Sequence, residues 1–146
     1  MKTFPVTVAA AIGSLLLVTS CVLSGGTRSK AAYFEAHVKP VFQANCLRCH
    51  QGPQAPARLD LSDRKSALAS VSPRTGRPFI IPSDPDCSLI VAAVTRRGTH
   101  PRVMPRQELS LTEDEIGELS EWIEDGAYWP EGPSGKLQAV FNPENP

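Results

Sequence analysis

The feature that most constrains this chain is the run Cys46-Leu47-Arg48-Cys49-His50, which has the spacing C-x-x-C-H. This spacing is the attachment signature of a c-type haem. Two thiols separated by two residues can both add to the vinyl groups at one porphyrin edge, and the adjacent imidazole is then held where it can bind the iron from one face. The sequence therefore predicts one haem c, covalently bound through Cys46 and Cys49, with His50 as an axial ligand of the iron.

Two other chemistries use the same side chains. Zinc binds Cys and His, but a zinc site usually has a second, matching pair of ligands downstream. Here only Cys87 and His100 follow, without the paired spacing. A thioredoxin-like C-x-x-C would follow a strand and use its thiols for exchange. Haem is favoured over both alternatives.

The N-terminus has the pattern of a secretory signal over residues 1–20, with a charged start and an apolar stretch from residue 6 to 18 that is too short to span a membrane well. It ends in Val18-Thr19-Ser20-Cys21, which resembles the bacterial lipobox. The resemblance implies cleavage before Cys21 and diacylation of its thiol, so that lipid anchors the chain on the periplasmic side of a membrane in the bacterial cell envelope. The alternative is an ordinary secretory signal, which also exports the chain from the cytoplasm. Bacteria attach c-type haem on that outer side of the membrane.

The 146 residues leave room for one domain. Because Cys21 lies at the leader and two cysteines form the haem motif, Cys87 is left over and no disulfide is expected. The net charge is zero but uneven: residues 46–106 carry ten Lys or Arg against four Asp or Glu, and residues 107–146 carry one against ten. The basic residues are scattered among prolines and aliphatic side chains, so we expect no nucleic-acid partner.

Helical patterns dominate the predicted domain, residues 31–130, which follows a Ser- and Gly-rich flexible tether at residues 21–30. An apolar face leads into the haem motif, with a kink or break expected around Val38 and Lys39 because of Pro40. Residues 131–146 are expected to form an irregular C-terminal tail.

Three further helices are predicted from their start and stop signals. The first begins at Ser62 or Asp63 and runs through Ser70, with Leu68 buried. The second begins at Ser83-Asp84-Pro85 and places Cys87, as a small buried residue, in its first turn. The third begins with a capping box, Thr112 to Glu115, and ends at Gly126.

The order helix, C-x-x-C-H, helices, Met-containing loop and amphipathic helix resembles the class I cytochrome c fold. More narrowly, the chain resembles the monohaem cytochrome c domains of planctomycetes and related bacteria. The stretches that carry this likeness are Val38 to Pro40, Cys46 to His50, Leu59-Asp60-Leu61, Ile81-Pro82-x-Asp84-Pro85 with Ser88-Leu89-Ile90, Met104-Pro105, and Leu111-Thr112 through Trp122-Ile123 to Pro130. The resemblance implies an all-α fold wrapped around one haem, with His50 as the proximal ligand of the iron and Met104 as the distal one.

The residues themselves also point to Met104. Once the signal with Met1 is removed, Met104 is the remaining methionine, and it lies in a loop beside Pro105. His100, four residues earlier, is the competing ligand and would give bis-histidine ligation. We favour Met104, because Met/His ligation is typical of electron carriers.

The expected function is one-electron transfer, without an enzymatic reaction, to redox protein partners that dock transiently. The basic middle of the chain suggests an acidic docking patch on such a partner. Two alternatives stay open: a fixed haem subunit of a respiratory or dehydrogenase complex, and a peroxidase-like enzyme with an open iron position.

Overall fold

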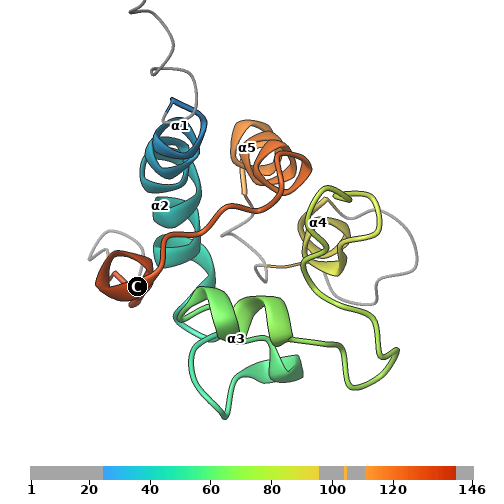
Figure 1. The fold of residues 1–146 in the computed structure, drawn as a ribbon. Helices are drawn as coiled ribbons and strands as arrows, with labels where there is room; N and C mark the ends of the chain where they lie inside the picture. The colour runs from blue at the N-terminus through green and yellow to red at the C-terminus, as the bar shows by residue number, and fades with distance from the viewer. Residues whose placement is uncertain (1–24, 96–103, 105–110, 141–146) are drawn as a thin grey trace, which may run out of the picture.

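The computed structural model describes residues 25–95, 104 and 111–140 (Figure 1). These residues form helices and loops without a strand, and an isolated antiparallel bridge pairs Val71 with Pro78. The all-α prediction is confirmed. The elements are α1 Gly25–Tyr33, η1 Phe34–Val38, α2 Lys39–Val41, η2 Phe42–Cys46, η3 Pro56–Arg58, α3 Arg64–Ala69, α4 Leu89–Val94, α5 Glu113–Glu124 and η5 Gly132–Gly135.

The first four elements form one continuous helix that ends at the haem motif, so the break expected around Val38 and Lys39 does not occur. Val38 and Lys39 both keep right-handed helical dihedrals. Two wide π-helical turns flank the proline: the Lys39 amide donates to the Phe34 carbonyl, and the Leu47 amide donates to the Phe42 carbonyl at 2.9 Å. These turns shift the carbonyl partners around a residue that has no amide hydrogen to donate, so the helix passes it unbroken.

The helix also begins earlier than expected. Its first residue is Gly25, so residues 25–30 are helical although the sequence assigned them to the flexible tether. Lys30 explains part of this difference, because its Nζ reaches the Asp125 carbonyl oxygen at 2.6 Å and a side-chain oxygen of Asp125 at 3.0 Å. The end of α5 thus holds the end of α1.

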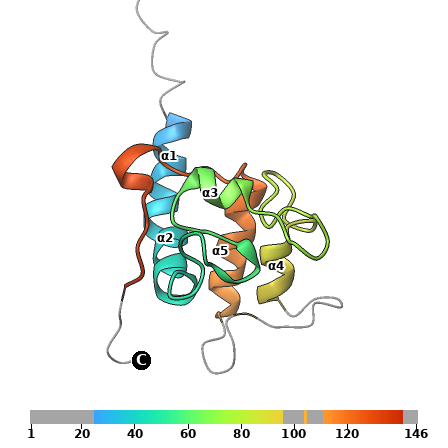
Figure 2. The same ribbon diagram turned by 90° about the horizontal axis from the view of Figure 1, so that it is seen from below.

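The last long helix, α5, lies along the haem-motif helix and beside α4 (Figures 1 and 2). Its predicted capping box is present: the Glu115 amide donates to Thr112 Oγ1 at 3.2 Å, and the Thr112 amide donates to Glu115 Oε2 at 2.8 Å. Gly126, with φ +98°, ends the helix in the left-handed conformation that glycine tolerates. Both boundaries agree with the prediction.

Four aromatic rings form the centre of the core between these two helices. Phe34 lies 5.0 Å from Trp129, Phe42 contacts Trp122 edge-on at 5.6 Å, and the two indoles are 6.0 Å apart, all between ring centroids. Both indole N–H groups are satisfied, because Trp122 donates to the Tyr128 carbonyl at 2.6 Å and Trp129 donates to the Gly135 carbonyl at 2.7 Å. Such rings bury large apolar areas without an unpaired donor.

The short helix α3, which follows the haem motif in the sequence, agrees closely with the prediction. Asp63 caps it by accepting from the Ser66 amide at 2.8 Å. The buried residue is Ala67, however, and not Leu68, which is only half-buried.

The start of α4 was predicted wrongly. The helix begins at Leu89, with Ser88 as its N-cap, and residues 83–88 form turns instead. Ser83 has φ +65° and its amide donates to the Ile123 carbonyl at 2.7 Å, so this stretch contacts the end of α5. Cys87 therefore lies before the helix and is exposed, contrary to the expected burial.

The C-terminal segment contains the short 3-10 helix η5 and is irregular over residues 136–140. It packs onto the domain through Leu137, which is 2% exposed. Within the described part of the chain, no helix has the length and apolar character needed to cross a membrane. The predicted signal, Cys21 and His100 lie outside the described residues.

Candidate haem-binding site

The haem motif follows directly from η2 as a helical turn. The Cys49 amide donates to the Cys46 carbonyl at 3.1 Å, and the His50 amide donates to the same oxygen at 2.8 Å. Positions three and four apart share one side of a helical turn, so the fold brings Cys46, Cys49 and His50 together. Leu47, 1% exposed, points into the core and fixes the turn to it.

The His50 ring is oriented by a backbone carbonyl from the following loop. Its Nδ1 lies 3.3 Å from the Leu59 carbonyl oxygen, nine residues along the chain. A histidine that donates from Nδ1 in this way has its tautomer fixed, with Nε2 free to bind a metal. Burial lowers the pKa of His50, although the carbonyls of Leu59 and Pro56 oppose this effect. The imidazole is thus favoured in the neutral form that a metal requires.

The loop that carries Leu59 is closed by the Asp60 carboxylate. Asp60 Oδ1 accepts hydrogen bonds from the Gly52 amide at 3.0 Å, the Ser62 amide at 3.0 Å and the Ser62 hydroxyl at 2.6 Å. Burial alone raises the pKa of Asp60, but these three donors outweigh it and hold the pKa below its usual value. Leu59 and Leu61, on either side of Asp60, are both buried, and sequence reasoning missed the role of Asp60.

The surroundings of Cys46 favour a neutral sulfur. Burial raises the pKa of its thiol to about 12, and the charge of Glu115 adds to the shift. A zinc ligand must be a thiolate, whereas the thioether bond to a haem vinyl group leaves the sulfur neutral. Among the described residues, no three His, Cys, Asp or Glu side chains gather as a metal-binding group. The donor set therefore fits covalently attached haem, whose iron His50 would bind through Nε2.

Met104 is half-buried, and its amide donates to the Ala93 carbonyl in α4 at 3.0 Å. This bond holds the residue against the C-terminal half of α4. His100 lies outside the described residues. The assignment of the sixth ligand to Met104 stays a prediction.

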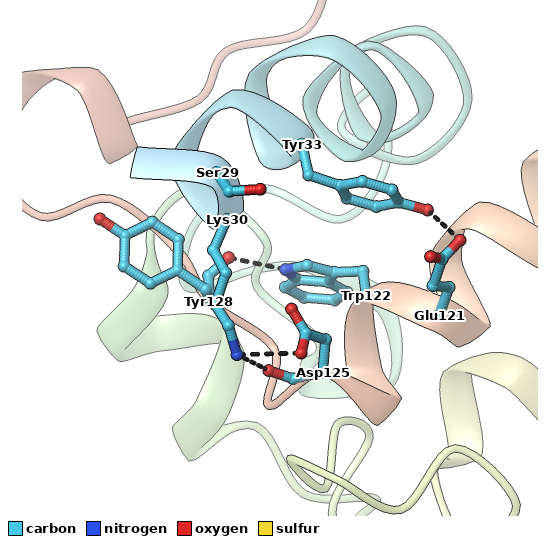
Figure 3. Close-up of a pocket in the computed structure, with 7 residues that line it drawn as sticks. All are labelled: Ser29, Lys30, Tyr33, Glu121, Trp122, Asp125 and Tyr128. Atoms are coloured by element: carbon cyan, nitrogen blue, oxygen red, sulfur yellow. Dashed lines mark hydrogen bonds and ion pairs between the residues drawn. The ribbon is translucent and has the colours of Figure 1, made fainter. Parts of the chain in front are cut away.

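A pocket of about 160 Å³ lies elsewhere, between α1 and α5 (Figure 3). Tyr33 and Trp122 line it, and the Tyr33 hydroxyl donates to Glu121 Oε2 at 3.0 Å. Nearby, His37 Nδ1 and Glu118 Oε1 are 2.6 Å apart. No residue of the haem motif lines this pocket, so it belongs to the packing of the two helices.

Residues 46–108 match the protein-family model described as planctomycete cytochrome C. Over these residues the chain matches a planctomycete-type cytochrome c domain. The match begins at the first haem-motif cysteine and extends past Met104, and it confirms the resemblance drawn from the sequence. A cytochrome c domain of this kind implies covalently bound haem c and haem-based electron transfer. The same comparisons found no matching curated protein and no matching solved structure.

Proposed function

We propose that this protein is a lipid-anchored, periplasm-facing carrier that transfers single electrons through one haem c ligated by His50 and Met104. The observation that carries the proposal is the helical turn that places Cys46, Cys49 and His50 on one side, with His50 Nδ1 held at the Leu59 carbonyl. Bound haem supplies an iron that changes oxidation state by one electron.

The residues of the chain have three tasks in this function. Cys46 and Cys49 fix the group covalently, and the Leu59 carbonyl keeps the imidazole in one tautomer and one orientation. Three buried leucines, Leu47 within the motif and Leu59 and Leu61 after it, would keep water away from the haem. A rigid ligand set needs little rearrangement when the charge on the iron changes. Transfer of a single electron also requires no substrate pocket.

Support for Met104 as the second ligand comes from its place in the matched segment and its bond to the Ala93 carbonyl. A thioether opposite a histidine raises the potential of the iron. The lipid on Cys21 would attach the domain to the membrane.

The expected partner is a redox protein with an acidic docking patch. The described part of the middle segment exposes the cationic residues Arg58, Arg64, Lys65, Arg74 and Arg77. Transient electron-transfer interfaces are small, so the attraction between these basic residues and an acidic patch would mainly steer the two proteins toward each other.

The proposal is tested on protein matured with haem. The denatured chain should keep its colour through acid-acetone extraction, and a pyridine haemochrome should give one haem c per chain.

Met104→Ala should abolish the near-infrared sulfur-to-iron band and lower the midpoint potential, whereas His100→Ala should leave both almost unchanged. The reverse pattern would establish bis-histidine ligation. Co-purification with other subunits from detergent-solubilised membranes would indicate a fixed subunit instead of a free carrier.

A further inference from the structure

The segment of residues 136–140, called the strap here, lies across the domain after η5. The Leu137 amide donates to the Ser62 carbonyl at 2.7 Å, and the Val140 amide donates to the Gln43 carbonyl at 3.2 Å. Gln43 Nε2 donates in return to the Gln138 carbonyl at 3.1 Å. The Leu137 side chain is 2% exposed and belongs to the hydrophobic core. The strap is thus fixed by backbone bonds at both ends and by one buried side chain.

The two anchor points of the strap lie on either side of the haem motif. Gln43 is in η2, three residues before Cys46, and Ser62 is in the loop after the motif. The strap therefore ties together the segment that enters the motif and the segment that leaves it.

The anchor at Ser62 continues toward His50 through a chain of hydrogen bonds. The amide and hydroxyl of Ser62 both donate to Asp60 Oδ1. On either side of Asp60, the Leu61 amide donates to the His50 carbonyl at 2.9 Å, and the Leu59 carbonyl lies 3.3 Å from His50 Nδ1. The bonds that orient His50 thus come from residues that Ser62 and Asp60 hold in place.

We infer that the strap is a positioning element for His50, acting through Ser62 and Asp60 on the carbonyl that fixes the imidazole. The inference rests on the proposed function in one respect, that His50 binds the iron. A partner that sets the orientation and basicity of a ligating histidine also tunes the metal. Loosening the strap should therefore change the midpoint potential as well as the stability.

The experiment uses the haem-loaded protein and two strap variants. Leu137→Ala removes the buried side chain, and Gln43→Ala is a milder change that removes only the side-chain bond to the Gln138 carbonyl. Gln138→Ala is the matched control, because its side chain is exposed and its carbonyl stays in place. The readouts are amide hydrogen exchange at Leu61 and in α5, and the midpoint potential.

Leu137→Ala should raise the exchange rate of the Leu61 amide about tenfold or more, with a smaller rise in Gln43→Ala and no change in α5 or in the control. The midpoint potential should move in the same order. Equal increases at Leu61 and in α5 would show a purely structural role and overturn the inference, as would faster exchange at Leu61 with an unchanged potential. Failure of the unaltered protein to hold haem c would count against the proposed function alone, because the exchange pattern still reports the coupling from strap to loop.

Discussion

Phe42 and Trp129 stack with ring centroids 5.5 Å apart and planes inclined by 29°. Phe42 lies in η2, four residues before Cys46, and Trp129 lies beyond the end of α5. The contact joins the helix that delivers the haem motif to the segment that follows the last helix. The position of the motif therefore depends on residues about eighty positions further along the chain.

Trp129→Ala is predicted to lower the free energy of unfolding by about 3–5 kcal/mol, the usual loss for a large buried aromatic side chain. It removes contacts with Phe34, Phe42 and Trp122 and leaves the Gly135 carbonyl without its indole donor. Urea unfolding followed by circular dichroism measures the change. Tyr128→Ala, at the neighbouring half-buried position, is the control and should cost clearly less. Equal losses would mean that the aromatic cluster is not the centre of the core.

Asp60→Asn is predicted to destabilise the protein at neutral pH by about 1–3 kcal/mol, because hydrogen bonds to a charged acceptor are worth more than neutral ones. The pKa of Asp60 lies below its unfolded value of about 3.9. Its contribution is therefore fully present above about pH 4 and is lost as the pH falls through the folded pKa. The wild type should lose stability over that acidic range more steeply than the variant in urea titrations. Parallel curves would contradict this role.

Tyr33→Phe tests the alkaline side. Burial raises the pKa of Tyr33 above its usual value of 10.0, and the hydrogen bond to Glu121 adds to the shift. The protonated phenol is thus favoured by folding, so its contribution is complete below about pH 10 and is lost as the pH rises above it. Above about pH 10 the wild type should lose stability faster than Tyr33→Phe. Glu121→Gln should bring the ionisation of Tyr33, read by phenolate absorbance, to lower pH.

Cys21→Ser is predicted to leave the protein unprocessed or to release it from the membrane, because the proposed lipid is its anchor. Fractionation of cells followed by mass spectrometry of the N-terminus measures both outcomes. An unmodified mature Cys21 in the wild type would instead identify an ordinary secretory signal.

Sequence reasoning succeeded where the signal was local. The capping box at Thr112 and the cap at Asp63 each need only a few neighbouring residues, and both are present. The start of α4 was missed because tertiary contacts hold the predicted capping residues, 83–86, outside the helix. Ser83 takes a left-handed conformation and bonds to the Ile123 carbonyl, so the capping pattern at 83–86 forms turns against α5.

The candidate site divides in the same way. Cys46, Cys49 and His50 could be assigned to a candidate haem site from the sequence, because the spacing of five consecutive residues carries the chemistry, and that assignment stays a prediction. The Leu59 carbonyl could not, since a backbone acceptor leaves no trace in the residue type. The strap bond between Gln43 and Gln138 spans 95 positions and likewise has no local pattern.

The wide turns of η1 and η2 have a consequence for changes in chain length. Each holds one residue more than an α-helical turn, so the haem-motif helix contains two residues beyond an uninterrupted α-helical count. Deleting the exposed Ala36 would convert η1 into an α-helical turn and leave the downstream face in register. Deleting one residue of α5 before Trp122 would instead rotate every following side chain by about 100° and turn Trp122 out of the core. The helix before Cys46 can thus shorten by one residue without turning the haem motif away from the domain.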